Sequence, residues 1–215
     1  MEKVKEVPYG VADFVTVMEQ NLYYVDKTMF IPELEKQPRN LFFIRPRRFG
    51  KSIFLSMLHS YYDCNQSAKF QSLFGNLWIG QHPTESQGKY QVLFLDFSQV
   101  SGNIDSLERN FDFYCSVKLD GFMRRYGESY SEETREKVRK AEFAMDKLAF
   151  IHDEAAQKGF SLYLIVDEYD NFTNVVLNEH GEKVYHAITH ADGFYRDVFK
   201  KFKGNFERIF MMGVS

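Results

Sequence analysis

The sequence has little of several features, and their scarcity excludes some classes of protein. Only two of its 215 residues are cysteines, Cys64 and Cys115, and their spacing suits neither a disulfide framework nor a metal-binding motif. No apolar run approaches the roughly 20 residues that a membrane-spanning helix needs, and residues 1–6 are too charged for a signal peptide. These absences predict a soluble protein of a reducing compartment, the cytoplasm, with no membrane partner.

Strong net charge is also absent. The formal net charge is −3, which argues against a protein whose whole surface is built for nucleic acid, although a local basic patch is compatible with it. Hydrophobic residues make up 44% of the chain, enough for a folded core, and the 22 Phe and 13 Tyr indicate an aromatic core more than a base-stacking surface. The length suits a helical lead-in over residues 1–40 followed by one domain over residues 41–215.

The most informative stretch is Arg45-Pro46-Arg47-Arg48-Phe49-Gly50-Lys51-Ser52. It follows the apolar run 41–44 and opens a helical pattern that starts at Ile53, which is the strand, loop and helix context of a phosphate-binding P-loop. Backbone N–H groups at a helix start favour an anion. We therefore expect Lys51 to reach the β/γ-phosphates of ATP and the Ser52 hydroxyl to bind Mg²⁺. The predicted nucleotide-binding residues of this loop are Arg47, Arg48, Phe49, Gly50, Lys51, Ser52 and Ile53.

The loop departs from the general pattern G-x-x-x-x-G-K-[ST], because Arg45 stands at the first glycine. A basic surface turn that contacts nucleic-acid phosphates is the alternative interpretation. Three roles stay open for Arg47 and Arg48. They stabilise the transferring phosphoryl group, which is the catalytic role we assign to Arg48, or they pair with Glu168 or Asp170, or they contact DNA.

A second half of the site follows the apolar run 162–166, which leads directly into Asp167 and Glu168. A buried strand that ends on two acids is the Walker B arrangement, in which Asp167 would hold Mg²⁺ through a water and Glu168 would deprotonate the attacking water. A solvated turn that caps a helix is the alternative. Another apolar run over residues 208–214 ends on Ser215, whose hydroxyl would sense the γ-phosphate.

The remaining pattern places these motifs in an α/β fold. We expect a buried strand at 92–97, turns over 66–83 and an exposed linker through 87–88. Helices are expected at 13–18, 29–35, 104–126 and 131–158, with one further helical face from Val184 to Phe202. Alternating strands and helices predict a three-layer αβα P-loop core with a mainly parallel sheet. His186 and His190 are interpreted as surface residues, because Ala187 replaces the Glu of a zinc-binding H-E-x-x-H helix.

Five motifs resemble the bacterial AAA-ATPase-like family. They are Val7-Pro8-Tyr9-Gly10-Val11-Ala12-Asp13-Phe14, Tyr24-Val25-Asp26-Lys27-Thr28, the loop 45–52, Val166-Asp167-Glu168-Tyr169-Asp170 and Gly213-Val214-Ser215. The resemblance implies a P-loop core whose Walker B strand lies beside a polar sensor strand, and a family loop that reads R-P-R-R-F-G-K-[ST]. It also implies a PD-(D/E)XK nuclease-like domain beyond this chain in many members, and through it nucleic acid as a partner. We expect the chain to be truncated after the sensor strand.

The sequence thus predicts an ATPase that binds ATP and ADP with Mg²⁺ and couples hydrolysis to a C-terminal or partner domain, with homo-oligomers compatible. Two alternatives stay open. One is a nucleotide-dependent switch that does not hydrolyse ATP, and the other is a nucleic-acid-binding module that uses the Arg47/Arg48 cluster.

Overall fold

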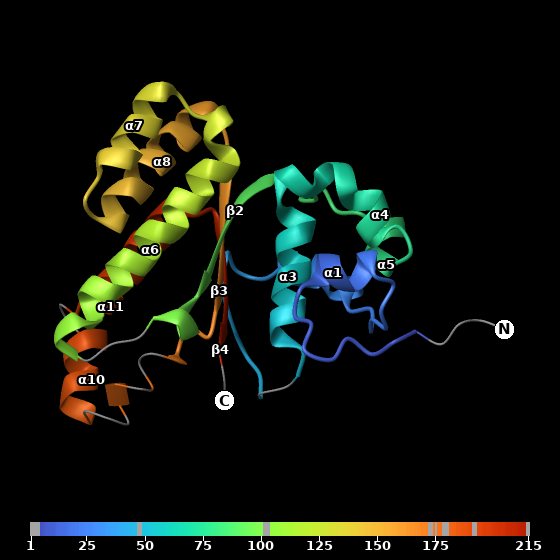
Figure 1. Ribbon diagram of the computed structural model, residues 1–215, viewed down its shortest axis with the longest axis horizontal. Helices are drawn as coiled ribbons and strands as arrows, with labels where there is room; N and C mark the ends of the chain where they lie inside the picture. Colours follow the sequence, from blue (N-terminus) through green and yellow to red (C-terminus); the bar gives the residue numbers. More distant parts are fainter. Residues whose placement is uncertain are drawn as a thin grey trace. The chain divides into compact units, whose positions relative to one another are not determined.

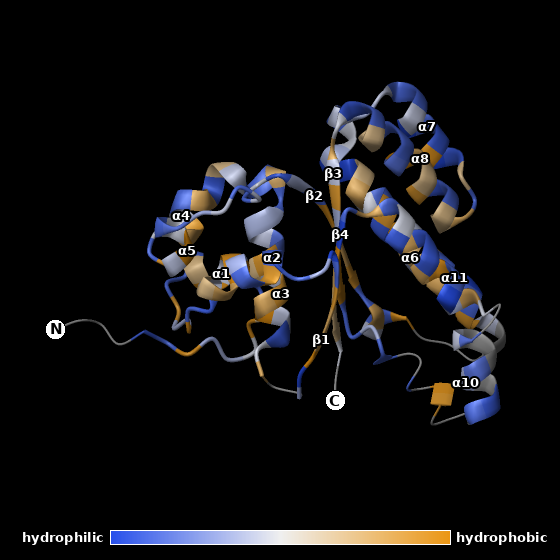
Figure 2. Ribbon diagram, turned by 180° about the vertical axis from the view of Figure 1, so that it is seen from behind, coloured by the Kyte–Doolittle hydropathy of each residue, from blue (hydrophilic) through white to orange (hydrophobic). Residues whose placement is uncertain are grey.

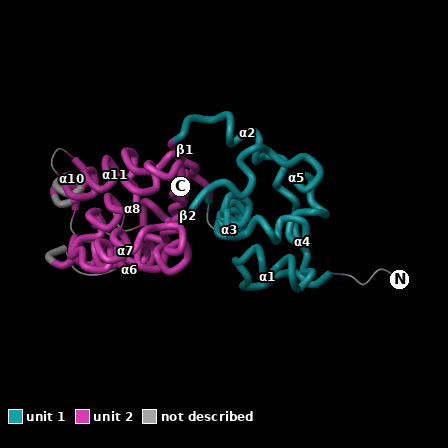
Figure 3. The backbone as a smooth tube through the Cα atoms, turned by 90° about the horizontal axis from the view of Figure 1, so that it is seen from above, with its two compact units in different colours: residues 1–39, 46–91 teal, residues 40–45, 92–215 magenta. Residues whose placement is uncertain are grey.

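The computed structural model describes residues 5–46, 49–100, 104–171, 174, 176–177, 181–190 and 193–213. The chain divides into two compact units (Figure 3). Unit 1 comprises residues 1–39 and 46–91, and unit 2 comprises residues 40–45 and 92–215. The domain boundary that we predict at residue 40 stays a prediction.

A four-stranded parallel sheet in the order β1-β4-β3-β2 forms the centre of unit 2 (Figure 1). In β1, Ile44 pairs with Gly213 of β4, while Asp167 of β3 pairs with Met212 of β4. Because these strands are parallel and in register, β1, β3 and β4 end at the same edge of the sheet. The strands are β1 (Asn40–Ile44), β2 (Tyr90–Asp96), β3 (Ser161–Asp167) and β4 (Arg208–Gly213), and the first two residues of β2 belong to unit 1.

The two central strands are apolar along nearly their whole length, as the orange of β3 and β4 in Figure 2 indicates. In β3, residues 162–167 are buried, and in β4 residues 209–213 are buried. Continuous apolar runs suit strands of a parallel sheet whose two faces are both covered, whereas a half-exposed strand would alternate. The predicted α/β class with a mainly parallel sheet is confirmed.

One face of the sheet carries helices of unit 2, with α6, α8 and α11 lying along it (Figure 1). Apolar side chains of α6 such as Leu107, Phe111 and Leu119 are buried, and its exposed side is mixed, with polar residues beside the exposed Phe113 and Val117. No helix within the described ranges is long and apolar enough to cross a membrane. The helices of unit 2 are α6 (Ile104–Tyr126), α7 (Glu132–Lys140), α8 (Ala144–Lys158), α10 (Glu182–Thr189) and α11 (Phe194–Asn205), with 3₁₀ turns η3 (Phe97–Gln99) and η4 (Gly127–Ser129).

The single helix predicted over residues 131–158 is wrong, because the chain turns between α7 and α8. Ala141 is extended, and the N–H of Ala144 donates to Oδ1 of Asp112 on α6 at 2.9 Å, which caps the start of α8 from a distant segment. The break lets α8 fold back along α7, so that Lys158 reaches the carbonyl of Ser129 at 2.8 Å.

The continuous helical face predicted from Val184 to Phe202 is also wrong. Helix α10 ends at Thr189, and His190 and Gly193 both take extended backbone conformations before α11 begins at Phe194. Residues 191–192, and with them Ala191 of the predicted face, lie outside the described residues.

Unit 1 is a cluster of short helices with an aromatic core. The ring of Phe14 stacks on Phe74 at 4.9 Å, and Tyr61 meets the same ring edge-on at 5.5 Å, so much of the aromatic content of this part of the chain is internal packing. Its helices are α1 (Phe14–Glu19), α2 (Ile31–Glu35), α3 (Lys51–Tyr62), α4 (Phe70–Phe74) and α5 (Trp78–Gln81), with 3₁₀ segments η1 (Thr28–Phe30) and η2 (Cys64–Lys69).

Residues 66–83, which the sequence predicts to contain turns, hold most of η2 and the two short helices α4 and α5. Leu73, Phe74 and Ile79 are all at most 1% exposed. Helices of four or five residues are too short to display a helical period, so the sequence pattern resembles a loop.

Candidate nucleotide-binding site

Helix α3 begins as a P-loop helix should. Gly50 is its N-cap, with φ 71° and ψ 30°, and its carbonyl accepts the first helical hydrogen bond from the N–H of Phe54 at 3.2 Å. A left-handed conformation favours glycine because a Cβ would be strained there. Gly50 has no side chain with which to cap this helix, and the first amides of the helix and the positive end of its dipole lie at the loop that precedes Lys51.

The loop residues differ in exposure. Lys51 is only 7% exposed, whereas Phe49 is 58% exposed, Ser52 is exposed and Ile53 is half-buried. Lys51 is therefore buried at the helix start, where a phosphate-binding lysine is required. Arg47 and Arg48 lie outside the described residues, so their predicted roles stay predictions.

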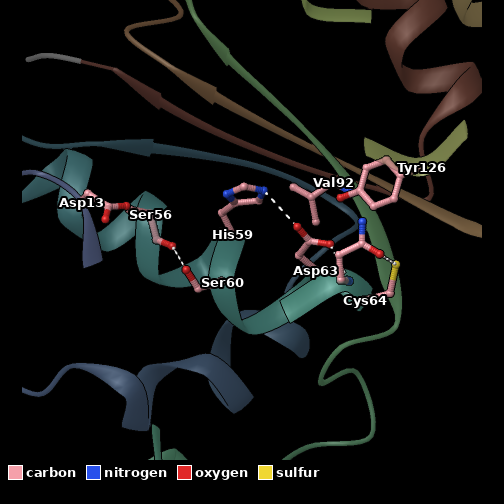
Figure 4. Close-up of polar contacts among 9 residues, drawn as sticks. Asp13, Ser56, His59, Ser60, Asp63, Cys64, Val92 and Tyr126 are labelled. Carbon is pink, nitrogen blue, oxygen red and sulfur yellow. Dashed lines mark hydrogen bonds and ion pairs between the residues drawn. The ribbon is translucent and has the colours of Figure 1, made fainter. Parts of the chain in front are cut away.

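The position of α3 is fixed through Ser56 (Figure 4). The Ser56 hydroxyl donates to Oδ1 of Asp13 at 3.0 Å and accepts the N–H of Phe14 at 2.9 Å. Asp13 also caps α1 by accepting the N–H of Thr16 at 2.8 Å. Partial burial raises the pKa of Asp13, but the hydrogen bonds from Thr16 and Ser56 outweigh it and the pKa is lowered. Asp13 of the motif 7–14 is thus a structural residue that clamps α1 to the P-loop helix.

The other end of α3 is held by a buried acid. Oδ2 of Asp63 lies 3.4 Å from Nε2 of His59, and its Oδ1 accepts the N–H of Asn65 at 2.9 Å (Figure 4). Asp63 is 1% exposed, so this acid stabilises the end of the helix and is not available to a ligand.

The acidic half of the site begins where β3 ends. Asp167 is 6% exposed, and its Oδ1 accepts the N–H of Glu168 at 2.9 Å. Glu168 is half-buried and has a φ of 51°, a left-handed conformation that a residue with a side chain rarely adopts. Such a conformation costs of order 1–3 kcal/mol and is concentrated at functional sites. The strained residue is the one that the sequence predicts as the catalytic base.

The turn after β3 is packed against the end of β4. The N–H of Tyr169 donates to the Met212 carbonyl at 3.3 Å, and on the other side of β4 the N–H of Arg45 donates to the Gly213 carbonyl at 3.2 Å. A Cβ on Gly213 would lie 2.6 Å from Oδ1 of Asp170. The Asp170 carboxylate therefore lies against the end of β4, a placement that its sequence position does not reveal. Ser215 lies outside the described residues.

Helix α11 supports the same turn through Tyr195, whose hydroxyl donates to the carbonyl of Tyr169. Burial raises the pKa of Tyr195, and the nearby negative charge of Asp170 raises it further. The pKa of Tyr169 is raised for the same two reasons. Both phenols therefore stay neutral beside an acidic sheet edge and serve as structural support.

The predicted site residues thus fall into two groups. Gly50, Lys51 and Ser52 belong to unit 1, and Asp167 and Glu168 belong to unit 2. The Nζ atom of a further residue, Lys27, lies close to Gly50. Lys27 stands inside the motif 24–28, but the sequence alone does not identify it as a site residue.

The two histidines interpreted as surface residues are both exposed, with their Nδ1 atoms 3.1 Å apart. Across the described part of the chain, no group of three or more His, Cys, Asp or Glu side chains is placed to hold a metal ion. Their proximity is therefore a local contact between His186 on α10 and His190 just after it.

Comparison with known proteins identifies the family of this chain. Residues 8–215 match the family model described as "Predicted AAA-ATPase". An uncharacterized protein in the vnfD 5′ region of Azotobacter chroococcum mcd 1 is 43% identical over 178 residues, which cover 77% of this chain and 29% of that relative. The chain therefore spans less than a third of this relative's length, and no solved structure matches it. Since the family model covers nearly the whole chain, the chain belongs to the AAA-ATPase-like family.

Proposed function

We propose that this chain binds Mg·ATP and hydrolyses it. The observation that supports this most directly is the left-handed Gly50, which immediately precedes Lys51 at the start of a 12-residue helix. This helix follows β1, a strand of a parallel sheet, in the chain. A loop between a strand and a helix is the structural context that a P-loop motif requires. Membership of the AAA-ATPase-like family adds independent support.

The residues present suit a nucleotide with its metal ion. The Lys51 ammonium and the positive end of α3 complement phosphate oxygens, and their placement at one helix start lets them act on the same group. Mg²⁺ prefers oxygen ligands, and we propose the Ser52 hydroxyl and the Asp167 carboxylate for that role. When bound, Mg²⁺ would neutralise part of the charge on the β- and γ-phosphates.

Glu168 is the proposed general base. A carboxylate next to the metal-binding acid of a Walker B strand can orient a water and accept its proton as the water attacks the γ-phosphate. Arg48 as the stabiliser of the transferring phosphoryl group and Ser215 as the γ-phosphate sensor complete the proposal.

Thermal unfolding with and without Mg·ATP tests binding. A ligand at a hundred times its dissociation constant stabilises a protein by about 2.7 kcal/mol, so the wild type should unfold at a clearly higher temperature with Mg·ATP. Lys51→Ala should lose this shift. Lys36→Ala is the matched control, because the exposed ammonium of Lys36 is paired with Glu33 at 2.7 Å. No shift of the wild type with ATP, ADP or GTP would contradict the proposal.

Phosphate release then tests hydrolysis. Glu168→Gln should reduce turnover by at least about 100-fold, the usual range for a general base, while the thermal shift with Mg·ATP is kept. A wild type that binds Mg·ATP and releases no phosphate would favour a nucleotide-dependent switch over an enzyme.

A further inference from the structure

A second lysine lies at the phosphate loop. A Cβ placed on Gly50 would be 3.8 Å from Nζ of Lys27. Both residues belong to unit 1, and Gly50 directly precedes Lys51. The Lys27 ammonium therefore lies beside the backbone that must approach a phosphate most closely in a P-loop.

The residues that flank Lys27 hold it in place. Oδ1 of Asp26 accepts the N–H and the hydroxyl of Thr28, at 2.8 and 2.7 Å. Oδ2 of Asp26 accepts the N–H of Trp78 at 2.7 Å, and the Thr28 hydroxyl oxygen accepts the N–H of Ile79 at 3.1 Å. Thr28 is fully buried. Both neighbours of Lys27 are thus fastened to the start of α5, which fixes the backbone that directs its side chain.

The charge of Lys27 is not compensated by a carboxylate of the residues that the structure describes. The side chain is half-buried, and within the described ranges no carboxylate forms an ion pair with its ammonium. A partly buried ammonium is stabilised by an anion nearby, and a phosphate group at Gly50 would supply one. The adjacent carboxylate, that of Asp26, instead accepts hydrogen bonds from the N–H groups of Thr28 and Trp78.

We propose that Lys27 is a second phosphate-binding lysine, which contacts the polyphosphate of the nucleotide at Gly50. This assignment rests on the proposed function and adds a residue from a different segment of the chain to the phosphate site. It also assigns different roles to neighbouring residues of the motif Tyr24-Val25-Asp26-Lys27-Thr28. Asp26 and Thr28 build the turn, and Lys27 binds the ligand.

The alternative is that Lys27 only packs against the loop. In that case its replacement lowers stability and leaves phosphate affinity unchanged. Titration calorimetry with Mg·ATP and with magnesium tripolyphosphate separates the two, because tripolyphosphate carries the phosphate charge without a base or a ribose.

The variants are Lys27→Gln, Lys27→Arg and Lys36→Gln. Lys27→Gln should raise the dissociation constants of ATP and of tripolyphosphate by about the same factor, roughly tenfold or more for one charge-assisted hydrogen bond. Lys27→Arg should recover part of the affinity, because it restores the charge. Lys36→Gln removes the same charge from an exposed position at the C-cap of α2 and should stay within twofold of the wild type.

Affinities of Lys27→Gln within twofold of the wild type would overturn the assignment, as would a loss for ATP without a loss for tripolyphosphate. A loss no larger than that of Lys36→Gln would indicate a general charge effect and would also overturn it. Failure of the proposed function is distinguishable from these results. In that case the wild type binds neither ligand, or Lys51→Ala binds both as tightly as the wild type does.

Discussion

The carboxylate of Glu154 on α8 accepts both the N–H and the hydroxyl of Ser131, at 2.8 and 2.9 Å. Ser131 is the N-cap of α7, and its hydroxyl oxygen in turn accepts the N–H of Thr134 at 3.2 Å. Glu154 is 8% exposed and pairs with Lys158 at 2.7 Å. One buried acid thus fastens the start of one helix to the last turns of the next.

Glu154 should make the stability of the chain depend on acid pH. Burial raises the pKa of Glu154, but hydrogen bonds from Lys158, Thr134 and Ser131 outweigh it and lower the pKa from 4.5 to about 2. Because the folded-state pKa is the lower one, the stabilisation is complete above about pH 4.5 and is lost as the pH falls toward 2.

Glu154→Gln should therefore lower the free energy of unfolding by about 1–3 kcal/mol at pH 7 and by much less near pH 3. Urea unfolding at the two pH values measures the difference. Glu136→Gln is the control, since its exposed pairs with Arg139 and Lys140 should contribute less than about 1 kcal/mol. A pH-independent effect of Glu154→Gln would contradict the prediction.

Lys147 and Asp120 form a second link between helices. Nζ of Lys147 is 2.7 Å from Oδ1 of Asp120, and Lys147 is 5% exposed. Asp120→Ala should lower the free energy of unfolding by about 2–3 kcal/mol, because it leaves a buried ammonium without its partner. Adding Lys147→Met should recover most of that loss in denaturant unfolding. A double variant as unstable as Asp120→Ala would show that the buried charge is not the cause.

The fold could be predicted where the local pattern of apolar and helix-ending residues determines the secondary structure. Helix α6 covers residues 104–126 as predicted, because its apolar stripe is regular and Gly127 stops it. The break between α7 and α8 could not be predicted. It depends on the contact of Asp112 with Ala144, two residues that no periodic pattern connects.

The site divides in the same way. Lys51 and Asp167 stand at the ends of elements that the sequence reveals, so their local positions could be predicted. The left-handed backbone of Glu168 and the approach of Lys27 to Gly50 could not, because each depends on tertiary packing. The sequence shows Lys27 only as a member of the motif 24–28 and assigns it no chemical role.

The conformation of Glu168 predicts an unusual order of stability. Glu168→Ala and Glu168→Gly both remove the carboxylate, but only glycine adopts a φ of 51° without strain. The glycine variant should therefore be more stable than the alanine variant by about 1 kcal/mol in denaturant unfolding. At Gln157, exposed within α8, the order should reverse, since glycine is the poorer helix former. The same order at both positions would contradict the prediction.

Two glycines should respond oppositely to alanine. A Cβ on Gly213 would lie 2.5 Å from Cε1 of Tyr169, so Gly213→Ala should destabilise the chain by about 1–3 kcal/mol. At Gly204, on α11, such a Cβ would meet no described atom within 4 Å apart from the adjacent residues and backbone of its own helix, and Gly204→Ala should be neutral or stabilising by up to about 1 kcal/mol. Thermal unfolding of the two variants tests the contrast, and equal midpoints would argue against close packing at Gly213.

The pairing of β1 with β4 also sets the timing of assembly during synthesis. Asn40 pairs with Ile209 and Ile44 with Gly213, so about three quarters of the 215 residues are translated between the two strands. While the ribosome makes the intervening residues, β1 has no β4 to pair with, and Arg45 at the start of the phosphate loop lacks its hydrogen bond to Gly213. Long-range parallel pairing of this kind forms late. Arg45 consequently gains this hydrogen bond only after β4 has emerged from the ribosome.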